Sequence, residues 1–144
     1  MAQQYSLQLK VKTMTVREAT GVIVNQSSHV ANFLSDITNA AQEMMFVITL
    51  NTKNNIIDKH LVSMGTLSES LVHPREIFRP AISDSAKSII LAHNHPSGDI
   101  TPSTQDNQIT QRIKAAGELL GISLLDHIII GNESYYSYLD ENNL

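Results

Sequence analysis

Two histidines, a serine and an aspartate lie close together in the segment 93–106. His93 and His95 are two positions apart, and Ser103 and Asp106 are three positions apart. Imidazole nitrogens and carboxylate oxygens are common zinc ligands, and a catalytic zinc site uses three of them and leaves a fourth position open to water. The residue types and their spacing therefore predict a metal centre formed by His93, His95 and Asp106, with the hydroxyl of Ser103 beside it.

The flanking segments predict how these side chains are positioned. The apolar run 88–92 is typical of a buried strand that leads into the first histidine. Successive side chains of a strand point to opposite faces, so His93 and His95 would point to the same side if the strand continues that far. The segment 96–102 contains proline and glycine and predicts a tight loop. A helix over 103 to about 120 follows and would return a carboxylate to the histidines.

Ser103 and Asp106 also have a purely structural explanation. A serine followed three positions later by an acidic residue resembles a capping box, in which both side chains satisfy the backbone at the start of a helix. Thr101 followed by Pro102 offers the same helix a different N-cap and first-turn pair. We expect the helix to use this second start, which would leave Asp106 available to a metal.

A catalytic site with a metal-activated water also needs a carboxylate that accepts the proton of the water and passes it to the leaving group. Glu43 stands just before the apolar run 44–48 and is a candidate for this general base. It is equally explained as a surface carboxylate between a helix and a strand. Spacing alone does not choose between Glu43 and its rivals, which are Glu69, Glu76 and Glu118.

Two further polar residues, Asp126 and His127, interrupt the apolar run 122–130. We expect one of them to face solvent and the other to be held by the backbone or by a neighbour of the ligands, without binding metal directly. The tyrosines at 135, 136 and 138 are expected to cover the sheet edge. They are not expected to stack on nucleic-acid bases, since no basic residues lie between them.

The remaining patterns predict a mixed sheet between helices. Residues 1–26 are interpreted as an N-terminal arm or strand, and Ser27 and Ser28 as N-caps of a helix over about 28–41. The order of elements predicts a single α/β domain over 27–144 with three layers, α/β/α. The other predicted elements are a hairpin over 44–64, a helix that begins at His73 with the stripe Ile77, Phe78, Ala81 and Ile82, a C-cap at Gly121, and strands over 122–130 and 135–139.

The composition is that of one globular domain without disulfides. The 144 residues are 42% hydrophobic and 17% charged, which is sufficient for a hydrophobic core. There is no cysteine, so a metal would be bound by His, Asp or Glu. No apolar run is long enough to cross a membrane and no signal-peptide pattern is present, which predicts a cytoplasmic protein with no membrane association.

The charge distribution argues against a broad nucleic-acid surface. The net charge is −4, and five acidic residues but no Lys or Arg follow Lys114. Binding to a phosphate backbone depends on clustered basic residues. Lys10, Lys12 and Arg17 make the start of the chain mildly basic, so nucleic acid is only a weakly supported partner.

The sequence around these residues resembles the RadC branch of the JAB1/MPN metalloproteases. His-x-His, seven residues, Ser, two residues and Asp is the JAMM pattern, and His93, His95, Ser103 and Asp106 fit it. The resemblance covers roughly residues 28–140. The flanking segments that fit the same branch are 65–67, 73–77, 93–99, 102–106 and 124–131.

This resemblance implies a cytidine-deaminase-like α/β/α domain with zinc held by His93, His95 and Asp106 and with water as the fourth ligand. It implies that Ser103 hydrogen-bonds the developing oxyanion, and it assigns the catalytic glutamate to Glu43. The function implied is hydrolysis of a peptide or isopeptide bond by zinc-activated water. The partner would be a protein or peptide substrate, and a homo-oligomer is compatible with the sequence.

Hypotheses from two other classes remain. The chain could be a DNA-associated repair or accessory module in which the metal site is structural or vestigial. Two histidines and one carboxylate also suit the non-haem iron oxygenases. The position of Ser103 and the absence of an obvious cosubstrate pocket in the sequence favour hydrolysis over this last reading.

Overall fold

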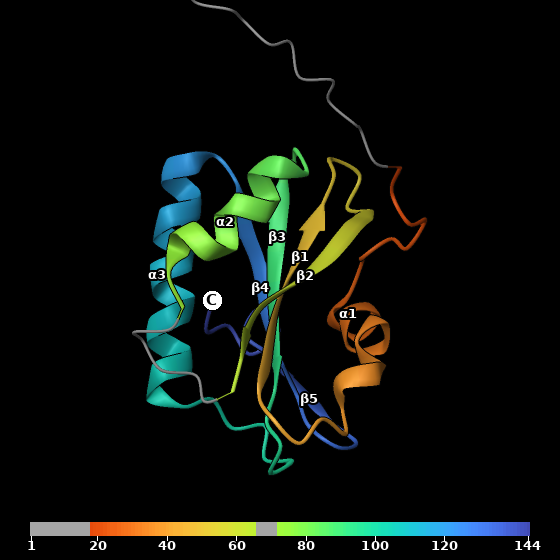
Figure 1. Cartoon of the computed structure of the whole chain (residues 1–144), viewed down its shortest axis with the longest axis vertical. Coiled ribbons are helices and arrows are strands. Elements are labelled where there is room, and N and C mark those ends of the chain that lie inside the picture. The colour runs from red at the N-terminus through yellow and green to blue at the C-terminus, as the bar shows by residue number, and fades with distance from the viewer. Residues whose placement is uncertain (1–17, 66–71) are drawn as a thin grey trace, which may run out of the picture.

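Five strands form one mixed sheet, and helices cover both of its faces (Figure 1). The computed structural model describes residues 18–65 and 72–144, so most of the predicted N-terminal arm lies outside the described residues. The elements are α1 (Ser27–Phe33), the 3-10 turn η1 (Ser35–Ile37), β1 (Met44–Leu50), β2 (Ile56–Met64), α2 (Pro74–Ser83), β3 (Ser88–Asn94), α3 (Thr104–Leu120), β4 (Ser123–Ile130) and β5 (Tyr135–Ser137).

The sheet has the strand order β2-β1-β3-β4-β5. Strands β3 and β4 are parallel and are connected by α3, whereas all other neighbours in the sheet are antiparallel. The β1–β2 pair confirms the hairpin predicted over 44–64. Strand β3 lies at the centre of the sheet, and all of its residues are buried, as expected of a continuous apolar run.

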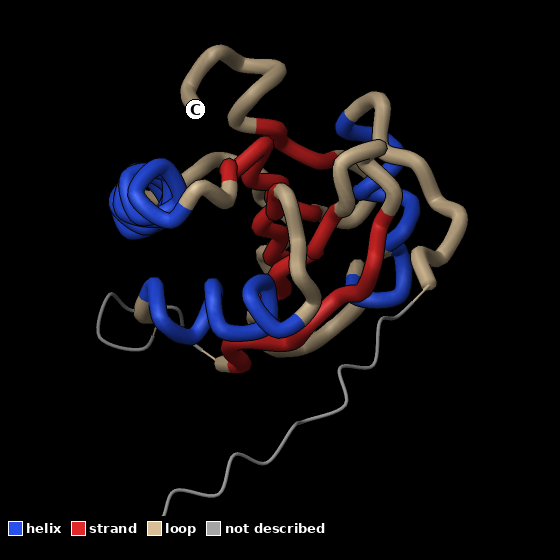
Figure 2. Tube along the Cα trace, turned by 90° about the horizontal axis from the view of Figure 1, so that it is seen from above, coloured by secondary structure: helices blue, strands red, loops and turns tan. Residues whose placement is uncertain are grey.

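Each face of the sheet has its own hydrophobic core. On one face, α2 and α3 contribute Phe78 and Ile109, which pack with Leu91 of β3. On the opposite face, α1 contributes Val30, which packs with Ile48 of β1. Figure 2 shows the helices on the two sides of the strands. This arrangement confirms the predicted three-layer α/β/α fold class, and it leaves one face of β3 directed toward α3.

Local signals predicted several element ends. His73 is the N-cap of α2, and Pro74 is its first residue. Gly121 closes α3 in the left-handed conformation, with φ of 72°, which glycine adopts without a steric cost. Ile82, in the last turn of α2, was predicted as part of the buried apolar stripe but is 60% exposed. Among the described residues, no helix is long and apolar enough to cross a membrane.

The first helix is shorter than predicted. Helix α1 ends at Phe33, and the N-cap is Gln26, not Ser27 or Ser28. The hydroxyl of Ser27 instead contacts the hydroxyl of Tyr135 in the edge strand β5, at 3.0 Å. The 3-10 turn η1 follows and keeps Ile37 buried against the sheet, so the apolar periodicity continues after the α-helix has stopped.

Candidate metal centre

The two histidines lie at the C-terminal end of β3, where the strand leaves the sheet. Strand β3 extends through Asn94, two residues further than the run predicted as a strand. His93 therefore lies within the ladder, paired with Met45 on one side and Ile129 on the other, and is completely buried. His95 follows on the same side of the chain, and 12% of its side chain is exposed. The predicted orientation of the pair is confirmed.

Asp106 reaches the histidines from the first turn of α3, and it also caps that helix. The hydroxyl of Ser103 accepts a hydrogen bond from the backbone N–H of Asp106 at 3.1 Å, and the carboxylate accepts one from the N–H of Ser103 at 2.8 Å. Ser103 is the N-cap, so the expectation that Thr101 and Pro102 would provide the helix start was wrong. The capping box and the approach to the histidines are compatible, because a carboxylate has several acceptor positions.

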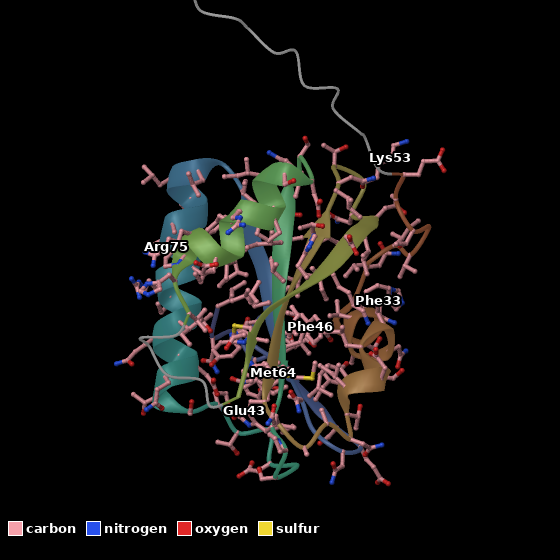
Figure 3. The ribbon with its side chains drawn as sticks, viewed as in Figure 1. Phe33, Glu43, Phe46, Lys53, Met64 and Arg75 are labelled. Carbon is pink, nitrogen blue, oxygen red and sulfur yellow. The ribbon has the colours of Figure 1, made fainter. Side chains whose placement is uncertain are left out.

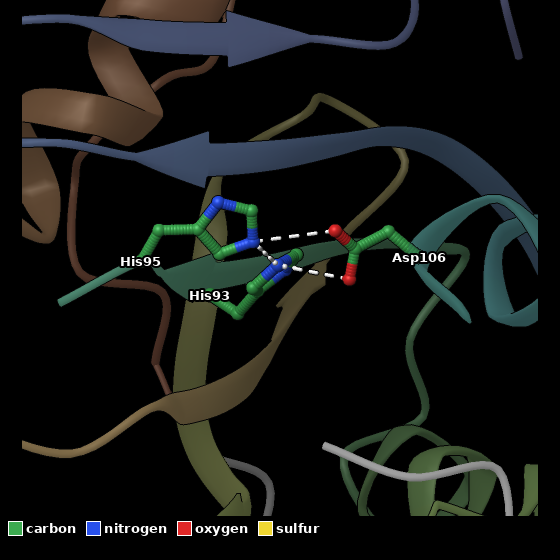
Figure 4. A group of neighbouring side chains, drawn as sticks. All are labelled: His93, His95 and Asp106. Carbon is green, nitrogen blue, oxygen red and sulfur yellow. Dashed lines mark hydrogen bonds and ion pairs between the residues drawn. The ribbon is translucent and has the colours of Figure 1, made fainter. Parts of the chain in front are cut away.

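The three side chains converge on one point (Figure 4). The Nε2 atoms of His93 and His95 are 3.0 Å apart, and each lies 3.2 Å from one carboxylate oxygen of Asp106. One ligand atom from each residue lies within 4.8 Å of the others. Tetrahedral zinc with ligand distances of about 2.0–2.1 Å would separate its ligand atoms by roughly 3.3 Å. The spacing of these atoms therefore fits a metal ion.

The protonation of His95 supports the same conclusion. Its Nδ1 lies 2.6 Å from the backbone carbonyl of Asp99, which can only accept, so the ring proton is on Nδ1. In its neutral form the ring directs the lone pair of Nε2 toward Asp106, whose oxygens are acceptors as well. Acceptors this close require a proton or a metal cation between them. The donor set of two imidazoles and a carboxylate is one that zinc accepts.

The charges in the site act on one another. Burial alone would raise the pKa of Asp106, but the hydrogen bonds that His93 and His95 donate when their Nε2 atoms carry protons outweigh burial and hold that pKa well below its usual range. The hydrogen bond to Asp106 is the main cause that raises the pKa of His95, and the negative charge of Glu43 adds to it as a smaller cause. Glu43 is therefore within electrostatic reach of His95.

Glu43 is held at the start of β1 by a side chain from between the two histidines. The buried amide of Asn94 accepts a hydrogen bond from the N–H of Met44 at 2.7 Å and donates one to the carbonyl of Gln42 at 3.0 Å. The backbone of Glu43 is thus fixed on both sides, and its carbonyl accepts from the N–H of Gly65 at 2.8 Å. Figure 3 shows Glu43 at the end of the molecule where α3 begins.

The rival glutamates are placed differently. Glu76 is in the first turn of α2 and forms an ion pair with Arg75 at 3.6 Å. Glu118 is near the C-terminal end of α3, twelve residues after Asp106, which is about 18 Å along a helix. Glu69 lies outside the described residues. Of the three candidates that the structure describes, Glu43 is the one whose charge contributes to the raised pKa of His95.

The expectation that Asp126 or His127 faces solvent was wrong, since both are buried. The carboxylate of Asp126 accepts hydrogen bonds from the hydroxyl of Ser137 and from the N–H of Leu139, which attach β4 to the segment that follows it. His127 points to the other face and lies 2.8 Å from His93, measured between Nε2 and Nδ1. Burial lowers the pKa of His127 well below its usual value.

Comparison with known proteins places this chain in a family. Residues 24–144 match the model of the RadC-like JAB domain. The chain belongs to the RadC-like JAB domain family. The resemblance carried by the His-x-His motif and its flanking segments is thereby confirmed, and the ligand cluster at the end of β3 fits the metal site that the JAMM pattern predicts.

Curated relatives of this RadC-like JAB domain are named UPF0758 proteins. The relative from Chlorobaculum parvum is 53% identical over 108 residues, which is 75% of this chain and 49% of the relative. The relative from Clostridium perfringens is 48% identical over 134 residues, 92% of this chain and 59% of the relative. The relative from Rubrobacter xylanophilus is 43% identical over 140 residues, 96% of this chain and 61% of the relative. The chain thus spans about half to three fifths of the length of these relatives.

Reasoning from sequence missed Thr110 of this RadC-like JAB domain and did not distinguish His127 from Asp126 as the neighbour of a proposed ligand. Thr110 lies one turn after Asp106 on α3, and its hydroxyl donates to the carbonyl of Asp106 at 2.7 Å. The same hydroxyl lies 2.6 Å from Nδ1 of His127. A threonine at i+4 from a predicted ligand and a histidine inside an apolar strand were the available signals. To connect these two residues, one had to know which strand pairs with β3.

Proposed function

We propose that this RadC-like JAB domain is a zinc-dependent hydrolase that cleaves a peptide or isopeptide bond with an activated water. The observation that carries the proposal is the convergence of His93, His95 and Asp106 at the end of a buried strand, with His95 partly exposed to incoming molecules. Three protein ligands leave a position open for water or substrate, as in catalytic zinc sites. Zinc, when bound, would polarise the scissile carbonyl and lower the pKa of water toward ~7.

Glu43 is assigned the role of general base and then general acid. It would take a proton from the attacking water and return it to the leaving amine. Its negative charge contributes to the raised pKa of His95, and this supports the role because it brings the carboxylate into electrostatic range of a proposed ligand. The two hydrogen bonds from Asn94 to the residues on either side of Glu43 support it further, since they restrict where the carboxylate can go.

Ser103 is assigned to the oxyanion that develops on the scissile carbonyl. Its hydroxyl accepts from the N–H of Asp106 and therefore keeps its own proton for donation. The residue is exposed and lies three positions before a proposed zinc ligand. Removal of one oxyanion donor costs about 2.7–4 kcal/mol in comparable enzymes, so Ser103→Ala should reduce turnover a hundredfold or more on that scale.

The test is zinc-dependent cleavage of defined probes. The zinc-loaded chain is incubated with a library of quenched fluorescent peptides and with lysine-linked isopeptide substrates. We expect cleavage that is lost with His93→Ala. Glu43→Gln should retain one zinc per chain and lose turnover, because the amide cannot accept the proton of water. Full activity of Glu43→Gln would remove this residue from the mechanism, and no cleavage of either probe set by the wild-type chain would contradict the hydrolase.

The identity of the metal needs a separate measurement. Two histidines and one carboxylate also suit iron in the non-haem oxygenases. Elemental analysis of protein purified without added metal should find zinc. Iron in place of zinc, with no hydrolysis of the peptide probes, would favour the oxygenase hypothesis instead.

A further inference from the structure

His127 and Thr110 form a buried chain of polar contacts behind His93 that the proposed hydrolysis does not use. Both residues are completely buried, His127 on β4 and Thr110 on α3. The contacts run from the carbonyl of Asp106 to Thr110 at 2.7 Å, from Thr110 to His127 at 2.6 Å, and from His127 to His93 at 2.8 Å. The ring of Tyr138 stacks on His127, with centroids 5.0 Å apart and planes inclined by 7°.

The protons in this chain can be assigned from its acceptor end. The carbonyl oxygen of Asp106 has no proton, so the 2.7 Å contact with Thr110 requires the hydroxyl to donate. The hydroxyl has a single proton, so Thr110 can only accept in its 2.6 Å contact with His127. The Nδ1 of His127 must therefore carry a proton and donate it to Thr110.

The assignment then passes from His127 to the proposed metal ligand. No carboxylate contacts the ring of His127 among the described residues, and a buried imidazole without such a partner is neutral. With its one proton on Nδ1, His127 offers a bare Nε2, and the 2.8 Å contact requires His93 to donate from Nδ1. A neutral His93 with its proton on Nδ1 presents the lone pair of Nε2 to Asp106 and His95, and this is the tautomer that a metal needs.

We propose that His127 and Thr110 are positioning residues that set the metal-binding tautomer of His93. The inference rests on the proposed metal site but not on any cleaved substrate. The backbone carbonyl of Asp106 is the first acceptor in this series of hydrogen bonds. Helix α3, which supplies the proposed ligand Asp106, therefore also determines which nitrogen of His93 carries the proton. The reverse arrangement would put a proton on Nε2 of His93 and would bring two oxygens to 2.7 Å with no proton between them. Hydrogen bonds to the second nitrogen of a ligating histidine commonly set its tautomer in this way.

A pair of substitutions at Thr110 separates this role from packing. Thr110→Val has almost the same shape but no hydroxyl, whereas Thr110→Ser keeps the hydroxyl and loses a methyl group. If the residue only fills space, Val should be the better replacement. Thr110, His127 and His93 are called the relay below. If the hydroxyl of Thr110 sets the protons of this relay, Thr110→Ser should bind zinc nearly as well as the wild type, and Thr110→Val should bind it about 10-fold to 100-fold more weakly. Zinc affinity is measured by competition with a chromophoric chelator.

The tautomer itself is read from the nitrogen-15 shifts of the histidine rings in the metal-free chain, at a pH where they are neutral. We expect the proton of His93 on Nδ1 in the wild type and in Thr110→Ser, and a mixture of tautomers in Thr110→Val. A proton on Nε2 of wild-type His93, or equal zinc affinity for the two variants, would overturn the proposal. Neither measurement needs turnover, so a chain that binds zinc as expected but cleaves no probe would contradict the hydrolase and leave the relay standing.

Discussion

At the scale of single residues, Asp106 has two roles that the sequence made look like alternatives. Its carboxylate accepts from the N–H of Ser103 and lies 3.2 Å from the Nε2 atoms of both histidines. The first turn of a helix is a favourable place for such a carboxylate, because the backbone N–H groups there stabilise negative charge. The cap therefore holds the carboxylate in the position from which it can bind metal.

Substitutions in the capping box should separate the two roles of Asp106. Ser103→Ala removes the side-chain cap and should lower the free energy of unfolding by about 0.5–2 kcal/mol. It should leave zinc stoichiometry at one per chain, because the N–H of residue 103 still donates to the carboxylate. Asp106→Ala should destabilise the chain and also abolish zinc binding. Denaturant unfolding and metal analysis check both, and loss of zinc in Ser103→Ala would show that the cap is required for the site.

At the scale of elements, the site depends on close contacts between segments that pack without intervening side chains. A Cβ atom at Gly131, just after β4, would lie 2.7 Å from the carbonyl oxygen of Gly98 and 2.7 Å from the side chain of Ile100. The loop that contains these residues also supplies the carbonyl of Asp99 that fixes His95. The β4–β5 turn thus sets the position of a loop that orients a ligand.

Gly131→Ala should therefore weaken metal binding from outside the ligand cluster. The added methyl group must displace the loop and with it the acceptor of the His95 proton. Gly121→Ala is the matched control, because its φ of 72° strains an alanine while no atom lies within 4 Å of the added Cβ. We expect both variants to unfold at lower temperature and only Gly131→Ala to lose zinc affinity. Equal zinc affinities in a chelator competition would contradict this role.

The link between β3 and the start of β1 gives a second prediction at this scale. Asn94→Ala removes both hydrogen bonds that fix the residues beside Glu43, but it does not change any ligand. We expect turnover to fall more than zinc affinity, because the proposed base loses its position while the ligands remain. The two are compared as kcat and chelator competition on the same preparation. A loss of zinc as large as the loss of turnover would mean that Asn94 supports the ligands instead.

At the scale of the whole molecule, the site joins parts of the chain that fold on one side of the sheet. The ligands come from β3 and α3, and the relay adds β4, so a bound metal would connect three adjacent elements. The opposite face is packed separately by α1 and contributes Phe46 and Ile90 to a different cluster. The site therefore lies on one face of the sheet, and the core formed with α1 packs against the other face.

Metal should stabilise the whole fold by mass action. A ligand that binds only the folded state adds about 2.7 kcal/mol when its concentration is 100 times Kd. We expect zinc to raise the Tm by several degrees and a chelator to reverse the change. His93→Ala should show no zinc-dependent shift. A shift of the same size in that variant would place the metal somewhere other than at this cluster.

The sequence by itself determined what depends on near neighbours along the chain. Alternation along a strand was enough to put His93 and His95 on the same side, and Gly121 was enough to end α3, because both follow from backbone geometry within a few residues. The β1–β2 hairpin and the three-layer order followed from apolar runs and the turns between them. The family motif added the expectation that His93, His95 and Asp106 bind a metal.

Only the tertiary structure decided what meets across elements. The local sequence could not decide whether α3 starts at Ser103 or at Thr101, since both patterns cap a helix. In the structure Ser103 is the N-cap, and the carboxylate of Asp106 also contacts His93 from another element. His127 looked like an interruption in a strand until the parallel pairing of β4 with β3 placed it against His93. Such contacts depend on strand order and on the crossover through α3, and no pattern within a few residues records them.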